Sequence, residues 1–338
     1  MDYNNDLSLR DRTGYPMLYC SQSSPTEVFM PTQVPARIGW GVSLLDIPRY
    51  WQLTKGKGIR VAVLDTAIAT NHPNLKEAVA EAVDYTGENQ EEVTCKIHGT
   101  HCAGIIAGRQ TDYGSVGIAP EASIYSAVVV NKEKKGRHNP MEAFVKAVQW
   151  AIKKQVHIIS ISLACNEKNE SMQVVINQAI EAGVFVVAAV GNSGTACEDV
   201  DFPAQYKGVI AVGAVDEYLN LAAYSSQGKS VDLVAPGKNI LSTYPPDVFA
   251  TMDGTSTAAP FVAGLLALCL CLYLSQLKVK HLNELEHQQL YYKALKNHLL
   301  SSTIELGQLG KDLKYGRGLI DPKQLLSVSK IKKIINSV

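Results

Sequence analysis

The sequence predicts an α/β fold built on a doubly wound, mostly parallel sheet with helices on both faces. Short runs of Val, Ile, Leu and Ala alternate along the chain with segments whose apolar residues recur at helical spacing. The strand-like runs are apolar throughout, which is typical of strands buried on both faces. Parallel strands joined by right-handed crossovers through helices account for both observations.

Local signals support the individual elements. Asn139 stands at an N-cap position before Pro140, and Gly183 stands where a helix ends in a left-handed residue. The apolar stretch at 261–274 is shorter than the ~18–20 residues of a membrane span and predicts a buried helix. The expected elements are, in chain order, strand 59–64, a helix from His98, strand 124–130, helix 141–153, strand 156–163, helix 172–182, strand 184–190 and strand 209–215.

Composition indicates a globular protein. The chain has 338 residues, 46% of them hydrophobic, and its 32 basic residues balance its 32 acidic ones. Without a net charge it has no field that would attract nucleic acid or an anionic membrane. The polar start predicts no secretory signal, and seven cysteines, an odd number, suggest thiols in a reducing compartment. We therefore expect a cytoplasmic protein with no nucleic-acid or membrane partner.

The chain divides into one large domain and two short ends. Residues 1–37 are polar and aperiodic, and we interpret them as an N-terminal tail or short pro-segment. Residues 38–325 carry the alternating pattern, and residues 326–338 are assigned to a C-terminal tail.

Three residues far apart in the sequence have the chemistry of an activated serine. Asp65 ends the strand VAVLD, His98 opens HGTHCAG, and Ser256 lies in GTSTAAP. A serine hydroxyl needs an imidazole to take its proton, and the imidazole needs a carboxylate to hold its tautomer. The order Asp, His, Ser differs from that of the chymotrypsins and of the α/β-hydrolases.

These segments resemble the signature blocks of the subtilisin-like serine proteases. The matching segments are VAVLDT at 61–66, HGTH at 98–101, AAVGNSG at 188–194, VDLVAPG at 231–237, GTS at 254–256 and YGRG at 315–318. The resemblance extends from about residue 38 to residue 322 and is strongest to the intracellular branch, whose members work in the cytoplasm and are often dimers. It implies a subtilisin-like fold, a polypeptide substrate and a homodimer.

The resemblance also implies a role for each matching residue. Ser256 would attack the scissile carbonyl, His98 would act as base and then as acid, and Asp65 would orient His98. Asn192, next to Gly191 in the substrate site, would donate a hydrogen bond to the oxyanion. A further expectation is that Ser162, Leu163 and Ala164 form the strand on which an extended substrate pairs. No cofactor takes part in this chemistry.

Asp201 points to a substrate preference. By the resemblance, this residue falls at the floor of the pocket for the side chain before the scissile bond, where a carboxylate would favour Arg or Lys. The alternative is that Asp201 faces solvent. A basic preference suggests a dedicated maturation protease, against the alternative of a broad intracellular protease, and also suggests that the tail is removed at or near Arg37.

Other interpretations of the same residues remain open. Ser256 could only cap the helix that follows it, and the whole cleft could hold peptides without cutting them. Where relatives carry a calcium-binding aspartate this chain has Asn74, so a structural calcium is doubtful unless Asp112 compensates. A zinc site is the remaining alternative, although the spacing of its candidate ligands fits no common zinc pattern: Cys95, His98, His101 and Cys102.

Overall fold

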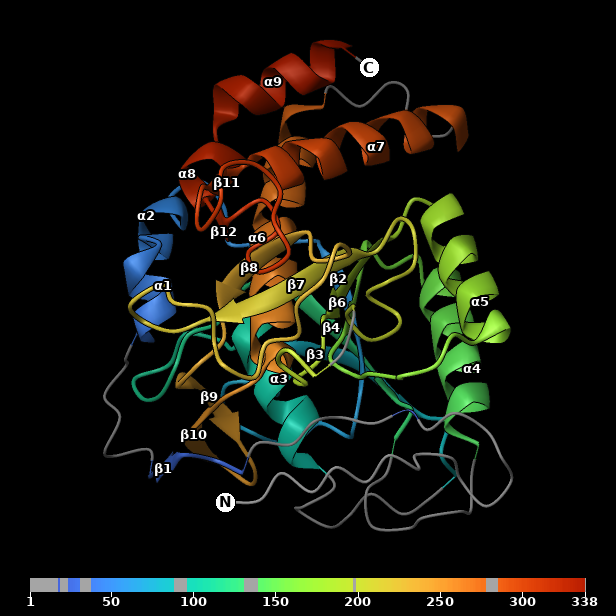
Figure 1. The fold of residues 1–338 in the computed structure, drawn as a ribbon. Helices are drawn as coiled ribbons and strands as arrows, with labels where there is room; N and C mark the ends of the chain where they lie inside the picture. The colour runs from blue at the N-terminus through green and yellow to red at the C-terminus, as the bar shows by residue number, and fades with distance from the viewer. Residues whose placement is uncertain are drawn as a thin grey trace.

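The central element of the molecule is a large, nearly parallel sheet (Figure 1). The computed structural model describes residues 18, 24–30, 38–87, 96–130, 139–196, 199–277 and 285–337. Within these residues nine strands form one sheet, in which every neighbouring pair is parallel except the edge pair that β11 makes with β12. In spatial order the strands are β11 (Thr303–Ile304), β12 (Leu319–Ile320), β8 (Leu233–Pro236), β7 (Ile210–Val215), β6 (Phe185–Ala189), β5 (Ile158–Ile161), β2 (Arg60–Asp65), β4 (Ser123–Val128) and β3 (Val79–Asp84).

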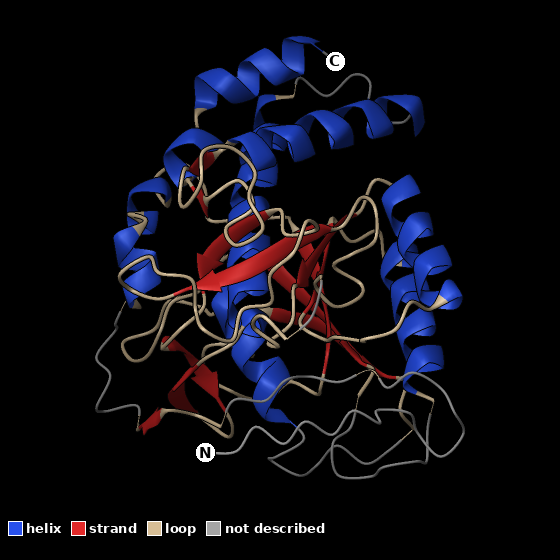
Figure 2. Cartoon of the chain, viewed as in Figure 1, coloured by secondary structure: helices blue, strands red, loops and turns tan. Residues whose placement is uncertain are grey.

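Helices cover both faces of this sheet (Figure 2). On one face α4 (Pro140–Lys153) packs beside α5 (Glu170–Glu181), and on the other α3 (Ile97–Ala107) packs beside α6 (Thr255–Gln276). Alternate residues of β2 join different cores: Val61 and Val63 belong to the cluster under α3 and α6, whereas Ala62 and Leu64 belong to the cluster under α4 and α5. This two-sided burial confirms the predicted doubly wound sheet.

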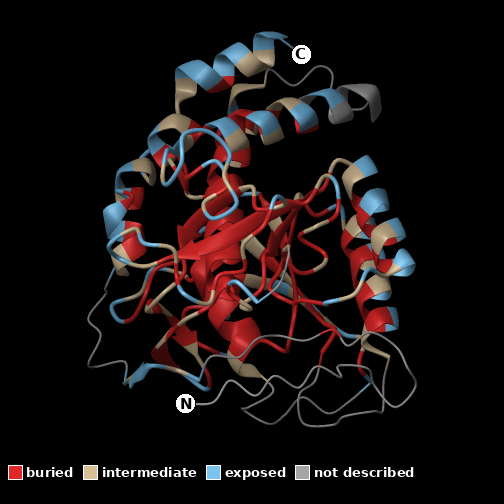
Figure 3. Ribbon diagram, viewed as in Figure 1, coloured by how far each residue is buried: buried red, intermediate tan, exposed pale blue. Residues whose placement is uncertain are grey.

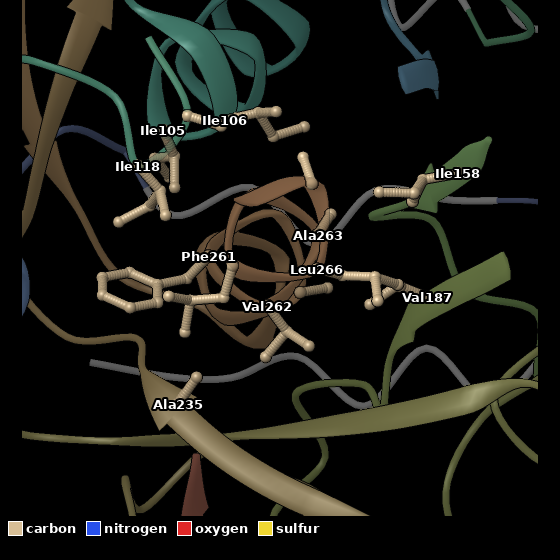
Figure 4. Packing of buried hydrophobic residues seen from close by; sticks show 14 of the residues in the cluster. Ile105, Ile106, Ile118, Ile158, Val187, Ala235, Phe261, Val262, Ala263 and Leu266 are labelled. Carbon is tan, nitrogen blue, oxygen red and sulfur yellow. The ribbon is translucent and has the colours of Figure 1, made fainter. Parts of the chain in front are cut away.

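Helix α6 is the centre of the larger core. Phe261, Val262, Ala263 and Leu266 project from it toward α3 and the strands around it (Figure 4), and the helix and sheet are buried while the outer helices expose one side (Figure 3). The helix is long and apolar enough to cross a bilayer, but 89% of its most apolar window is buried inside the fold. It is therefore the core helix that the apolar stretch predicted, and it begins six residues earlier, at Thr255.

A second, three-stranded antiparallel sheet holds α3 from outside the main sheet. Its strands are β1 (Glu27–Phe29), β10 (Val248–Met252) and β9 (Ile240–Tyr244), in that order. The hydroxyls of Ser242 and Thr243 donate to the carbonyls of His101 and Thr100, each over 2.8 Å. Strand β9 is thus bonded to the helix that begins at Ile97, and β10 leads directly into Ser256.

The two ends of the chain are partly built into this body. The remaining helices are α1 (Trp40–Leu44), α2 (Ile47–Tyr50), α7 (Leu285–Ser301), α8 (Pro322–Leu325) and α9 (Val328–Ser337). Helix α9 packs on α6 and α7, and its Ile331 is fully buried in the larger core. Within the segment 326–338, which the sequence pattern set apart as a tail, residues 328–337 therefore continue the packed domain as α9, and residues 27–29 of the N-terminal tail form β1.

The local sequence signals act as predicted. The side chain of Asn139 accepts hydrogen bonds from the backbone N–H groups of Met141 and Glu142 and caps α4. Gly183 has a φ of 75° directly after the end of α5. Strand β2 is as long as predicted and shifted by one residue, whereas β4, β5, β6 and β7 are shorter than their apolar runs by one to four residues, because the remaining residues lie in the loops at the ends of the strands.

Candidate active site

Asp65 and His98 form a buried acid–imidazole pair. Asp65 ends β2 with 0% of its surface exposed, and His98 lies in the first turn of α3 with 2% exposed. His98 Nδ1 lies 2.7 Å from Asp65 Oδ1, which also accepts a hydrogen bond from the backbone N–H of Thr66. A carboxylate at Nδ1 selects the tautomer that carries its proton there, so Nε2 holds the lone pair.

The end of β2 and the start of α3 are held in close contact. The backbone N–H of Gly99 donates to Thr66 Oγ1 over 2.9 Å. A Cβ atom at Gly99 would stand 2.4 Å from the carbonyl oxygen of Thr66, so a side chain there would push the helix away. Gly99 is therefore required, because a larger residue would move α3, and His98 with it, away from Asp65.

The outer nitrogen of the imidazole is available for chemistry. His98 Nε2 is buried and has no hydrogen-bond partner among the described residues. A buried nitrogen lone pair without a donor is unfavourable in a site that serves only to stabilise the fold. It is the atom that a general base would use, and in this structure it makes no hydrogen bond with Ser256 Oγ.

Ser256 is connected to the helix of His98 through its own carbonyl. Pro260 lies inside α6 and has no N–H, so it cannot donate the usual helical bond to the carbonyl four residues earlier. That carbonyl belongs to Ser256, and it accepts instead from Ser162 Oγ at 2.8 Å and from Cys102 Sγ at 3.4 Å. The nucleophile candidate is thus bonded both to the helix of His98 and to the segment that follows β5.

Ser256 does not cap its helix. Gly254 is the N-cap residue of α6, no side chain caps the helix there, and Ser256 is already its second residue. The capping interpretation of this serine was therefore wrong.

Gly254 keeps open the space between Ser256 and Asn192. Its φ of +148° disfavours any residue with a side chain. A Cβ atom at this position would lie 2.6 Å from Ser256 Oγ, 3.4 Å from Asn192 Nδ2 and 3.5 Å from the backbone nitrogen of Ser256. A hydroxyl and two N–H donors therefore converge on one small volume that contains no side chain.

The orientation of Asn192 is fixed by Thr255. Asn192 Oδ1 accepts from the backbone N–H of Thr255 at 3.0 Å and from its hydroxyl at 2.8 Å. Because a backbone N–H only donates, the atom facing it must be the amide oxygen, and the NH₂ group is turned to the other side.

The thiol of Cys102 lies against this pair. It is 1% exposed and its sulfur is 3.9 Å from His98 Nδ1. The ligand atoms of Asp65, His98 and Cys102 all lie within 4.8 Å of one another, but the 2.7 Å contact joins the first two directly, as a hydrogen bond does. These residues fit an acid–imidazole pair better than a metal site.

The alternative of a zinc site gains no support from His101, which does not join His98 and Cys102 in the group of candidate ligands among the described residues. His101 Nε2 bonds to the carbonyls of Ile240 and Ala250, and burial lowers the pKa of this histidine to about 4. His101 is therefore a neutral histidine of the core, and Cys95 lies outside the described residues.

Asp201 is buried beside Gly191. It is 5% exposed, which excludes the solvent-facing alternative. Its backbone N–H donates to the carbonyl of Val190 over 2.9 Å, and a Cβ at Gly191 would stand 2.0 Å from Asp201 Oδ2. Burial, with a smaller contribution from the Asp201 charge, raises the pKa of the Cys165 thiol, which places that charge near the segment after β5.

The segment 162–164 connects the surroundings of Ser256 with those of Asp201. Ser162, Leu163 and Ala164 are all buried directly beyond the carboxyl end of β5. Cys165, the next residue, forms an antiparallel bridge with Phe202, so this segment and Asp201 are held side by side.

The structure therefore gathers every predicted site residue at one edge of the sheet. Sequence reasoning missed three that position them: Thr66, Thr255 and Pro260. Thr66 and Thr255 had a signal, since each is a hydroxyl residue adjacent to a candidate. Pro260 stands in the GTSTAAP segment that carries the resemblance, but its role depends on which groups approach the carbonyl that it releases, and only the structure shows them.

Comparison with known proteins gives consistent matches. The model of the subtilase family matches residues 56–318. The chain is 33% identical over 320 residues to an intracellular serine protease of Paenibacillus polymyxa, covering 93% of each protein. It is 38% identical over 237 residues to the major intracellular serine protease of Bacillus subtilis, covering 68% of this chain and 73% of that one. It is also 35% identical over 287 residues to subtilisin DY of Bacillus licheniformis, covering 84% of this chain and 97% of that one.

Proposed function

Since the chain belongs to the subtilase family and is a serine endopeptidase, we propose that Asp65, His98 and Ser256 are its catalytic triad. The observation that carries the proposal is the 2.7 Å contact of His98 Nδ1 with a fully buried carboxylate, with Nε2 left without a partner among the described residues. Subtilases need no cofactor for catalysis, and none enters this scheme.

In this mechanism the proton of Ser256 passes to His98. His98 Nε2 takes the proton while Ser256 Oγ bonds to the carbonyl carbon of the substrate, and Asp65 stabilises the imidazolium. His98 then gives the proton to the leaving amine, which departs and leaves an acyl-enzyme. A water molecule, deprotonated by the same nitrogen, releases the acid product.

Asn192 and the backbone N–H of Ser256 stabilise the negative charge of the tetrahedral intermediate. Both donors face the volume beside Gly254 that contains no side chain. Because Thr255 already holds the amide oxygen of Asn192, its NH₂ group needs no reorientation when the charge develops.

Labelling with a fluorophosphonate probe tests the nucleophile. The full chain should be labelled, Ser256→Ala should not, and His98→Ala should react far more slowly. Ser301→Ala is a matched control, because this exposed serine lies on α7, outside the proposed site. Labelling that persists in Ser256→Ala would place the nucleophile elsewhere.

The buried Asp201 supports a preference for Arg or Lys before the scissile bond. The segment 162–164 would pair with the extended substrate, and the side chain before the cut would enter between this segment and Gly191. Asp201 Oδ2 lies against Gly191, where a guanidinium could form a charge-assisted contact with it. A peptide panel that differs at this one position tests the proposal, and a higher kcat/KM for Leu or Phe than for Arg and Lys would contradict it.

A basic preference favours a maturation protease that removes a leader from one precursor. A broad intracellular protease is the alternative. Digestion of unfolded casein distinguishes the two enzymes. A maturation protease should leave most peptide bonds of casein intact, whereas cleavage at many unrelated sites would support the broad enzyme.

The N-terminal tail is a candidate inhibitor. Leu18 is 4% exposed and belongs to the same buried cluster as Leu163 and Met141, although it precedes the domain by twenty residues. We propose that the tail blocks the substrate site until it is cut at or near Arg37, which lies outside the described residues. Leu18→Asp should raise the activity of the uncut chain. An active preparation that retains Met1 by mass spectrometry would contradict the maturation.

A cytoplasmic location is supported by the two relatives that are named intracellular proteases. Cys165, Cys269 and Cys271 carry thiols that a reducing compartment would preserve. Cell fractionation tests this location. From the family resemblance we also propose a homodimer, and sedimentation of the full chain measures the oligomeric state.

A further inference from the structure

The loop at residues 109–115, which follows α3, is closed by a buried amide. Asn74 is 1% exposed, and its Nδ2 donates to the carbonyl of Arg109 at 2.8 Å, the hydroxyl of Thr111 at 3.2 Å and the carbonyl of Ser115 at 3.4 Å. The backbone N–H of Arg109 donates in return to the carbonyl of Asn74 over 2.8 Å. The two hydrogens of one NH₂ group thus satisfy oxygens from both ends of the loop.

The identity of the atom at the centre of this loop is decided by its neighbours. Backbone carbonyls only accept hydrogen bonds, so the atom that faces Arg109 and Ser115 must be the nitrogen of Asn74. Calcium requires oxygen ligands, usually with carboxylates among them. A nitrogen with two hydrogens cannot bind the ion, and its hydrogen bonds already engage the carbonyl oxygens of Arg109 and Ser115.

A second side chain gathers carbonyls on the other side of the same loop. The guanidinium of Arg109 is half-buried and donates from Nη1 to the carbonyls of Pro120 at 2.6 Å and Ala122 at 2.9 Å, and from Nη2 to the carbonyl of Glu77 at 2.9 Å. It stands two residues beyond the end of α3, where the helix dipole favours a positive charge. Asp112, the one acidic residue of the loop, is exposed.

We propose that the amide of Asn74 and the guanidinium of Arg109 together replace a structural cation, so that this loop holds its conformation without calcium. Residues in this region do not fit the calcium site that the family resemblance implies. The calcium response of this loop is independent of the catalytic roles, and Ser256→Ala enters the test only to prevent self-digestion.

The test compares Asn74→Asp, Asn74→Ala and the unchanged residue, all in full chains that carry Ser256→Ala to prevent self-digestion. Thermal unfolding is measured with EDTA, with calcium chloride and with sodium chloride at equal ionic strength. The parent should have one midpoint in all three. Asn74→Asp should lose roughly 4–10 °C in EDTA, because it replaces the donor by a charge that faces carbonyls, and should regain most of the loss with calcium. Asn74→Ala should lose a similar amount and regain none.

Two controls keep the outcome specific. Asn177→Asp makes the same chemical change on the exposed side of α5 and should not respond to calcium. The second control is hydrogen exchange in the parent chain, which needs no variant to fold. The backbone amides of Arg109 and Gly117, which donate to the carbonyls of Asn74 and Gly108, report on the loop. Faster exchange of these amides in the parent on adding EDTA would overturn the proposal, and so would an Asn74→Asp chain that folds but does not respond to calcium.

Discussion

Gly254→Ala is the substitution that most directly tests the geometry of the site. Two separate effects are expected. The φ of +148° is unfavourable for alanine and should cost about 1–3 kcal/mol of stability. The added Cβ would also stand 2.6 Å from Ser256 Oγ and 3.4 Å from Asn192 Nδ2, in the volume where the oxyanion would form.

The effect on catalysis should exceed the effect on stability. Loss of one oxyanion donor typically lowers turnover by about 10²–10³, and displacement of Ser256 Oγ adds to it. We therefore expect kcat to fall at least ~10²-fold, with a smaller change in KM, because the substrate segment 162–164 is not touched.

Gly58→Ala is the matched control. Gly58 also has a positive φ, +83°, but a Cβ there would meet nothing within 4 Å. It should lose a comparable amount of stability in a urea titration and keep its kcat on a peptide substrate. If Gly254→Ala remained folded and kept a kcat comparable to that of Gly58→Ala, the volume beside Gly254 would not be the oxyanion site.

Three further outcomes follow from the same contacts. Asp65→Asn should lower kcat by about 10⁴ with little change in the unfolding midpoint, since it disturbs the tautomer of the histidine and not its packing; a loss below tenfold would exclude Asp65 from the triad. Asp201→Ser should reduce kcat/KM for an Arg peptide roughly 10- to 100-fold and leave a Leu peptide unchanged, so an equal loss for both peptides would point to a structural role. Burial lowers the pKa of both His101 and His157 from 6.5 to about 4. The unfolded chain therefore binds protons at a higher pH than the folded one, and stability should fall by up to about 1.4 kcal/mol per pH unit for each histidine from pH 6.5 to pH 4. Urea unfolding of Ser256→Ala at several pH values measures this slope, and His157→Gln should reduce it.

The fold class and the candidate site residues could be inferred from the sequence for a physical reason. A strand buried on both faces must be apolar throughout, so β2, β5, β6 and β7 could be located from composition alone. The carboxyl ends of parallel strands share one edge of the sheet, so Asp65, the last residue of β2, and Asn192, shortly after β6, belong to the same edge.

The elements that the sequence did not predict lack such a pattern. Strand β3 has alternate intermediate and exposed residues at the sheet edge, and β1 is a three-residue strand that exists only by pairing with β10. Helix α9 has a clear apolar side, but nothing in its sequence says which surface covers it; the structure places that side on α6 and α7.

The sequence by itself determined the residue types that this chemistry needs, their order along the chain and the layers that hold them, because periodicity and composition fix local structure and burial. Only the tertiary structure decided that Asp201 is buried beside Gly191, that Pro260 releases the Ser256 carbonyl to Ser162 and Cys102, and that an amide stands at the centre of the loop after α3. Each of these depends on which groups from distant segments come within hydrogen-bonding distance, and such contacts are set by packing of the whole chain and not by any local pattern.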